Sequence, residues 1–353
     1  MGLLPVKPAE MLISHTGSHT RGRSCDELPF VAVVCEGFTA DHLLDSRCLL
    51  SPPAPEESYH HVGCKTPVQS TIPTRMAGLL LALRLLAPQA PEVLSADLKP
   101  QTLEAFSRYV QATEARIQKE RGSEEFLYIE NLPEPRRAQV ADQVRHGDIF
   151  MERLRTRDAA GREIEAPDAL IHHWVGAVFI PGATLRQTLD LVQDYDHHQE
   201  FYKPEVVRSR LVSHQGNDFA VYYRLRKKKI ITVTLNTNYD VRYFPLDSRH
   251  CYSQSYSTRI AEVADADTPQ EHEKPVGHDG GFLWRLYSYW RFEEKDDGVY
   301  VECEAVSLTR DIPTGLGWLI KPFITSIPRE SLQMTLSATR TGVLARMHAT
   351  AGE

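Results

Sequence analysis

Between Val206 and Ser307 the sequence alternates apolar and polar residues in short runs, and polar breaks separate the runs. Successive side chains of a β-strand point to opposite faces, so this alternation is typical of strands with one buried face. The positions that share a parity are Phe219, Val221, Tyr223 and Leu225; Ile231, Val233, Leu235, Thr237 and Tyr239; and Trp284, Leu286, Ser288 and Trp290. The stretch therefore predicts one long antiparallel sheet.

The breaks between the runs have the composition of tight turns. Asp297-Gly298 is the strongest signal among them, because glycine accepts a positive φ without steric cost and a two-residue turn matches the twist of paired strands. We therefore expect residues 282–292 to pair with residues 299–308.

Helical patterns precede the sheet and follow it. Apolar residues recur at spacings of three and four in residues 102–120, which predicts an amphipathic helix there. A weaker helix is expected from Pro135 to about residue 146, and the main sheet is expected to begin with a strand at 169–180. The last helix carries a stripe that must lie on an apolar surface, and the free face of the sheet is the obvious partner. The stripe consists of Leu332, Leu336, Thr339, Val343 and Met347.

Composition limits the class of protein. The chain has 353 residues, of which 42% are hydrophobic, so it is long enough to bury a substantial core. A formal net charge of −7 offers no general attraction to nucleic acid, and no nucleic-acid partner is expected.

The first 97 residues differ from the rest. Residues 1–75 lack sustained periodicity, and they are expected to be disordered or an over-extended start of the gene. Residues 76–97 are interpreted as a signal segment and linker, since an apolar run from Met76 ends in small residues near Ala90. Translation from Met76 would make the protein periplasmic or secreted. Arg84 within the run favours the alternative, a helix in a cytoplasmic protein.

The order of elements resembles that of the START-like, helix-grip superfamily, which includes polyketide cyclases, birch-pollen-type allergens and lipid-transfer domains. The resemblance covers residues 169–343. It rests on three stretches: Gly176-Ala177-Val178-Phe179-Ile180-Pro181-Gly182 followed by 185–204; Ser307-Leu308-Thr309-Arg310; and Ile320-Lys321-Pro322-Phe323 through 327–332. It implies an α+β fold, in which a curved antiparallel sheet wraps around the C-terminal helix over residues 169–347. Residues 98–168 would then form a helical extension with a hairpin.

The resemblance also implies a cavity between sheet and helix that binds an apolar or amphipathic, lipid-like molecule. Glu302 and Glu304 are expected to face water, so Val301, Cys303 and Ala305 should face the helix. By the same parity Trp284, Leu286, Ser288 and Trp290 should point inward, and Arg285 and Arg291 outward. The residues that we expect to contact the ligand are Tyr223, Tyr239, Tyr256, Trp284, Trp290, Cys303, Met334 and Leu336. A filled core without a cavity is the alternative.

The sequence predicts neither a metal site nor a cofactor. The pairs His172-His173 and His197-His198 do not suit one metal ion, because adjacent strand residues point to opposite faces. They are interpreted as surface or hydrogen-bonded histidines.

Two other functions stay open. A polyketide-cyclase or aromatase-like enzyme would need Asp240, His250 or Glu293 inside the cavity. A scaffold protein would have a solid core and an exposed apolar helix face within residues 98–146.

The basic tip at Arg226, Lys227, Lys228 and Lys229 is expected to be a solvated turn. The alternative is transient contact with an anionic membrane, which a lipid-carrying domain must meet.

Overall fold

The computed structural model describes residues 95–122, 125–229, 231–312 and 317–351, and it places the side chains of all of these except 317–324 and 350–351. They belong to a unit that comprises residues 79–353. The predicted N-terminal segment, residues 1–75, and the predicted signal sequence from Met76 to Ala90 lie outside the described residues.

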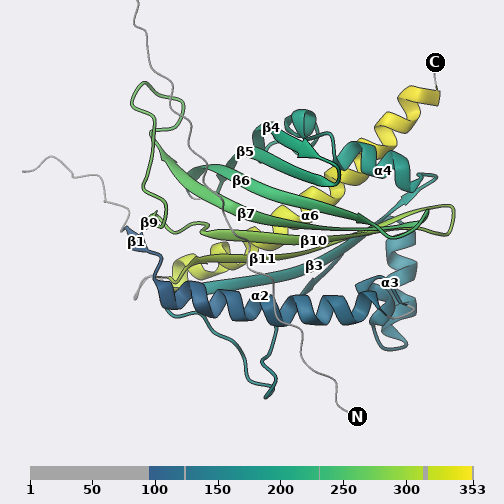
Figure 1. The fold of residues 1–353 in the computed structure, drawn as a ribbon, viewed down its shortest axis with the longest axis horizontal. Helices are drawn as coiled ribbons and strands as arrows, with labels where there is room; N and C mark the ends of the chain where they lie inside the picture. The colour runs from purple at the N-terminus through teal and green to yellow at the C-terminus, as the bar shows by residue number, and fades with distance from the viewer. Residues whose placement is uncertain (1–94, 123–124, 230, 313–316, 352–353) are drawn as a thin grey trace, which may run out of the picture. The chain divides into compact units, whose positions relative to one another are not determined.

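The described part of the chain contains one large antiparallel sheet (Figure 1). Its strands are β2 (Phe150–Arg153), β3 (Ala169–Pro181), β4 (Val206–Gln215), β5 (Asp218–Lys228), β6 (Thr232–Pro245), β7 (His250–Ala264), β8 (His272–Glu273), β10 (Arg285–Glu294) and β11 (Gly298–Arg310). They lie in the order β2-β3-β11-β10-β7-β6-β5-β4, and β8 pairs with the end of β7. Two short strands, β1 (Ala96–Asp97) and β9 (His278–Asp279), pair separately.

The predicted hairpin is confirmed, since β10 and β11 pair from Arg285 with Leu308 to Glu294 with Val299. The turn itself is one residue earlier than expected. Asp296 and Asp297 take the two positive φ angles, 58° and 57°. Gly298 instead begins β11, where a Cβ atom would lie 2.5 Å from the carbonyl oxygen of Ile180. This glycine is needed for close packing of two strands.

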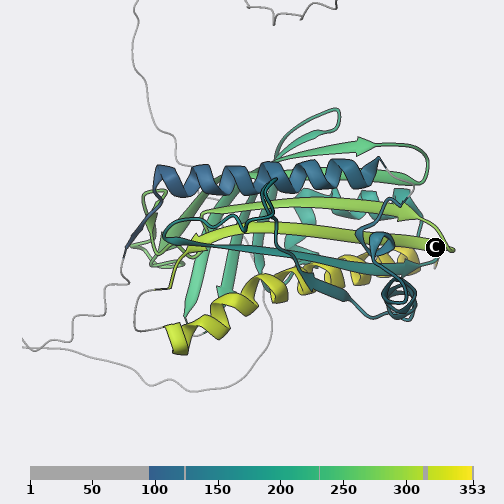
Figure 2. The same ribbon diagram turned by 90° about the horizontal axis from the view of Figure 1, so that it is seen from below.

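Helices lie on both sides of the sheet. They are α2 (Pro100–Arg121), α3 (Arg136–Arg145), α4 (Leu185–Val192), α5 (His198–Phe201) and α6 (Gly317–Ala351), with 3₁₀ turns η1 (Tyr128–Asn131) and η2 (Tyr195–His197). Figure 2 shows α2 and α6 on opposite sides of the strands. We call the two surfaces of the sheet the α2 face and the α6 face.

The C-terminal helix packs on the sheet as the sequence predicts. Leu332, Leu336 and Val343 of α6 are buried in one cluster with Val178 of β3 and Val301 of β11. Helix α6 is continuous through Pro328, because a proline removes one helical hydrogen bond while tertiary packing holds the remaining turns. The long antiparallel sheet with this helix on one face has the architecture of the helix-grip fold.

On the α2 face, the prediction that charged side chains face water is wrong. Glu302, Glu304 and Arg291, which parity correctly places away from α6, are each only 2% exposed rather than facing water. Helix α2 and the turn η1 cover them, since α2 pairs with Arg291 and Glu304 and the backbone of η1 donates to Glu302. Helix α2 also buries Phe106 and Ile117 in a second apolar cluster on this face. Strand parity tells which residues share a face, but it does not tell whether another segment covers that face.

No helix in the described part of the chain is both long enough and apolar enough to span a membrane.

Candidate functional site

Helix α6 packs directly against the sheet at Gly176 of β3. A Cβ atom at this position would lie 2.6 Å from Cδ1 of Leu336 and 2.7 Å from Sδ of Met151. The absence of a side chain therefore lets the helix cross β3 in direct contact with its backbone. This contact fixes the position of α6 relative to the strands beside it.

One part of the α6 face is closed by packing. Val178, Ile180, Val299 and Val301 are fully buried there, together with Leu191 of α4. Such packing is that of an ordinary protein core.

Another part of the same face is less covered. Trp174, Tyr223, Leu286, Trp290 and Ala305 pack against the buried cluster but stay partly exposed. We call these five residues the α6-face patch. Aromatic and aliphatic side chains left half-covered beside a helix form the type of surface that apolar ligands cover.

The predicted ligand contacts divide between the two faces. Tyr223, Tyr239, Trp290, Cys303 and Leu336 lie on the α6 face. Met334 is half-buried on α6. The remaining two, Tyr256 and Trp284, lie on the α2 face.

These two residues are corrections to the predicted site. Tyr256 donates a hydrogen bond to Glu114 of α2 at 2.7 Å, and the sequence around it is polar on both parities, so no pattern assigned its face. Trp284 precedes β10, so the alternation of that strand does not extend to it. Its indole nitrogen donates to Asp279 at 3.2 Å.

A cluster of tyrosines and one histidine borders the patch. The hydroxyl of Tyr223 and Nδ1 of His198 share a hydrogen bond of 2.8 Å, and Tyr195 and Tyr243 join their hydroxyls at 2.9 Å. Burial lowers the pKa of His198 to about 4, so its imidazole is neutral at physiological pH. The sequence marked His198 only as half of a histidine pair and gave no signal that it lies near Tyr223.

A second histidine lies on the α6 face. His172 is buried, and its Nε2 lies 3.0 Å from the hydroxyl of Thr309. Burial, and secondarily the charge of Arg153, lowers its pKa to about 4. His173 points to the other face and contacts Glu304 and Tyr109, as expected for adjacent residues of a strand.

The three candidate acid–base residues do not lie on the α6 face. Asp240 is exposed and pairs with Tyr256, while Glu293 pairs with Tyr300, which is in the α2-face cluster. His250 pairs with Glu293 and contacts Asp247 at 2.9 Å. The arrangement that would favour a cyclase is thus not seen among the described residues.

The observation that would favour a scaffold is not seen either. Ala105, Phe106, Tyr109, Val110 and Ile117, which form the apolar side of α2, are all buried. The described part of residues 98–146 contains no large exposed hydrophobic side chain.

The basic tip is largely neutralised by the protein. Arg226 pairs with Asp267, Lys227 with Glu205, and Lys229 with Glu330 at 2.6 Å. Of the four predicted membrane contacts, Lys228 is exposed without an ion pair among the described residues.

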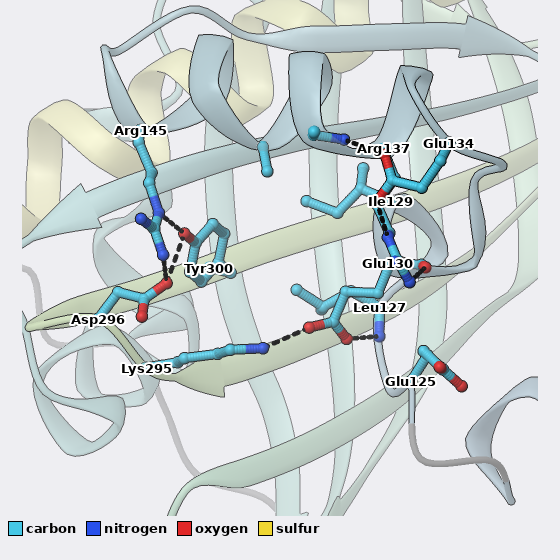
Figure 3. Close-up of a pocket in the computed structure, with 12 residues that line it drawn as sticks. Glu125, Leu127, Ile129, Glu130, Glu134, Arg137, Arg145, Lys295, Asp296 and Tyr300 are labelled. Carbon is cyan, nitrogen blue, oxygen red and sulfur yellow. Dashed lines mark hydrogen bonds and ion pairs between the residues drawn. The ribbon is translucent and has the colours of Figure 1, made fainter.

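A pocket of about 340 Å³ lies elsewhere, between η1, α3 and the turn that joins β10 to β11 (Figure 3). Its charged side chains already pair with one another: Lys295 with Glu130 at 2.5 Å and Arg137 with Glu134 at 2.8 Å. Tyr300 accepts from Arg145 at 2.7 Å and donates to Asp296 at 3.0 Å. This is a depression ringed by ion pairs rather than an apolar ligand site.

No group of three or more His, Cys, Asp or Glu side chains in the described ranges could hold a metal ion.

Comparison with known proteins supports no assignment beyond the fold. No protein-family model matches the chain, and no curated protein matches it. Among solved structures, the STAR-related lipid transfer protein from Xanthomonas axonopodis is 16% identical, with a TM-score of 0.34 over 51% of this chain and 95% of that one. Human STARD10 is 10% identical, with a TM-score of 0.36 over 62% and 85%.

The Zhui aromatase/cyclase from Streptomyces sp. R1128 is 13% identical, with a TM-score of 0.31 over 50% of this chain and 96% of that one. Scores this low carry no argument about activity. The START-like, helix-grip fold of the chain follows from its strand order and from the position of α6.

Proposed function

We propose that the protein binds, and can carry, an apolar or amphipathic small molecule between the sheet and α6. The observation that supports this proposal is the burial gradient on the α6 face. Leu336 and Val301 are fully buried, whereas Trp174, Leu286 and Trp290 in the same cluster stay partly exposed.

Removing apolar surface from water contributes about 25 cal/mol per Å², so a ligand that covers about 200 Å² of the patch gains about 5 kcal/mol from this surface alone. Part of that gain offsets the loss of translational and rotational freedom on binding. The half-covered aromatic side chains thus favour an occupant of mainly apolar character.

Native mass spectrometry followed by organic extraction tests the proposal on protein expressed in its own host or a near relative. We expect a co-purifying molecule in the mass range of lipids. The same spectrum tests the predicted export, because cleavage of a signal segment would give a mature chain that begins near Pro91.

A pair of variants tests the location. Ala305→Phe adds a large side chain to the α6-face patch, whereas Ala220→Phe adds it to β5 opposite Asp240, on the other face. We expect A305F to lose the co-purifying molecule and A220F to keep it, with both variants checked for folding by circular dichroism. Equal ligand content in the two variants, or a ligand-free wild type with no thermal shift across a panel of lipids and polyketides, would contradict the proposal.

A further inference from the structure

The α6 face carries serine hydroxyls without partners. Among the described residues, no hydrogen bond joins the hydroxyls of Ser253, Ser255, Ser288 or Ser307 to the protein. Ser253 and Ser307 are nonetheless only 1% and 6% exposed. The hydroxyl of Tyr239, on the same face, is buried without a hydrogen-bond partner. A buried hydroxyl without a partner is unfavourable, so a bound molecule that supplies a partner to Tyr239 would recover that loss. The serine hydroxyls keep some accessible surface, so a ligand can reach them.

The strand register places these serines beside the apolar patch. Ser255 lies opposite Ser288, and Ser253 lies opposite Trp290. Ser307 lies opposite Leu286 on β11. Directly paired residues of antiparallel strands share a face, so hydroxyls and half-covered apolar side chains form one continuous surface.

The two faces of the central strands differ in charge. On the α6 face, the register of β3, β10, β11 and of residues 251–257 of β7 gives apolar side chains, hydroxyls and His172. The one charged residue among them is Glu294 at the end of β10, which accepts a hydrogen bond from the backbone N–H of Leu185 in α4 at 2.6 Å. The α2 face of the same strands carries Arg291, Glu293, Glu302 and Glu304. Charged side chains do lie at the margins of the α6 face: Lys227 pairs with Glu205, and Glu262 pairs with Lys274.

This contrast argues against a charged ligand group over the central strands. Transfer of an ion into an apolar site is unfavourable unless a counter-charge is present. His172 and His198 supply none, because both imidazoles are neutral at physiological pH. A serine hydroxyl both donates and accepts, so it suits either a hydroxyl or a carbonyl group.

We propose that the ligand is an uncharged, mainly apolar molecule, and that its hydroxyl or carbonyl groups hydrogen-bond to Ser253, Ser255, Ser288 and Ser307. This inference rests on the proposed function and adds the chemical class of the ligand and the residues that recognise it.

Isothermal titration calorimetry with two lipids of equal chain length tests the class. Dioctanoylglycerol is uncharged, and dioctanoyl phosphatidate has the same chains with an anionic group. We expect the diglyceride to bind at least about tenfold more tightly. Equal or tighter binding of the phosphatidate overturns the inference. The proposed function still stands in that case if Ala305→Phe abolishes the binding.

A double variant tests the residues. Ser255→Ala with Ser288→Ala removes two hydroxyls and little volume, and it should weaken diglyceride binding about tenfold, since each hydrogen bond contributes about 0.5–1.5 kcal/mol. Ser213→Ala, at an exposed position of the edge strand β4, is the matched control and should leave the affinity unchanged. Unchanged affinity in the double variant overturns the role of the serines.

If neither lipid binds, organic extraction of the purified protein tests the proposed ligand class. A co-purified uncharged molecule with hydroxyl or carbonyl groups supports the inference, and a co-purified anion or plain hydrocarbon overturns it. A protein that carries and binds nothing overturns the proposed function itself, and the inference with it.

Discussion

At the scale of single residues, Arg291 is the buried cation that links several polar groups on the α2 face. Its guanidinium pairs with Glu120 at 2.7 Å and with Glu302 at 3.3 Å, and it also donates to the carbonyl oxygen of Phe126. Glu302 further accepts the backbone N–H groups of Tyr128 at 2.8 Å and Ile129 at 3.2 Å. Each charge here is tolerated because its partners replace the lost water.

Replacing Arg291 by methionine should therefore destabilise the protein by about 3–5 kcal/mol, because two carboxylates lose their buried partner. Urea unfolding followed by circular dichroism measures the change. Arg285→Met is the control on the same strand, since Arg285 is half-buried and, among the residues that the structure describes, donates only to the carbonyl of the adjacent Trp284. A loss in R291M no larger than in R285M would show that the buried network contributes little.

The two buried histidines predict how stability depends on pH. Burial lowers the folded-state pKa of His172 and of His198 to about 4, while the unfolded chain titrates near 6.5. Below pH 6.5 the unfolded state therefore binds protons that the folded state does not, and the free energy of unfolding falls as the pH drops from 6.5 towards 4.

For each histidine the loss between pH 7.5 and pH 5.0 should be about 2 kcal/mol. His198→Gln has no group that titrates in this range and can still hydrogen-bond to Tyr223, so it should lose less stability than the wild type over the same interval. Urea unfolding at the two pH values gives the comparison. Parallel losses in the two proteins would mean that His198 does not titrate as an isolated buried imidazole.

At the scale of elements, the sequence predicted what depends on local patterns. The turn signal predicted that β10 pairs with β11, and the stripe with Leu332, Leu336 and Val343 predicted the face of α6 that packs on the sheet. Periodicity could not reveal that α2 covers the other face, because that contact joins segments more than a hundred residues apart. The hydrogen bond between Tyr109 and His173 could not be predicted either, because it joins residues 64 positions apart.

The candidate site was predictable to the same extent. Tyr223, Trp290 and Cys303 follow from strand parity, and the structure places all three on the α6 face. The hydrogen-bond partner of Tyr223 and the lack of one for the Ser253 hydroxyl among the described residues depend on three-dimensional packing. No sequence pattern predicts either of them.

The contact between α6 and β3 at Gly176 can be tested by mutation. Gly176→Ala places a methyl group 2.6 Å from Cδ1 of Leu336 and 3.1 Å from the carbonyl oxygen of Phe150, so it should destabilise the protein by about 1–3 kcal/mol. Leu336→Ala alone should cost about 2–5 kcal/mol, because Leu336 is fully buried. In the double variant the clash with Leu336 is absent, so the combined loss should be smaller than the sum. Urea unfolding of the four proteins completes the cycle, and strict additivity would show that α6 does not press on β3 at this point.

At the scale of the whole molecule, the described elements before β3 bind the rest of the unit through a buried polar layer. Arg116 and His173 pair with Glu304, and Glu114 accepts hydrogen bonds from Tyr256 at 2.7 Å and Tyr289 at 2.8 Å. Such groups satisfy each other only while α2 stays in place. If α2 belonged to an appended domain, each part would keep its own hydrogen bonds after the two were separated. Here, separation of α2 would leave polar groups of the sheet without partners.

Removal of the elements before β3 should therefore disrupt the rest of the fold. A chain that begins at Ala169 keeps the part that resembles START-like domains but exposes Phe179, Tyr289 and Val306, which are buried in the α2-face cluster. Beside them, Glu304 loses Arg116 and Glu302 loses its two backbone N–H donors. We expect it to lose cooperative thermal unfolding in calorimetry and to bind the dye ANS, which reports exposed apolar surface. The full-length chain is the reference. A truncated chain that unfolds cooperatively near the full-length Tm would instead mean that residues 98–168 are a separable domain, and that the charged layer beneath α2 is stable when it faces water.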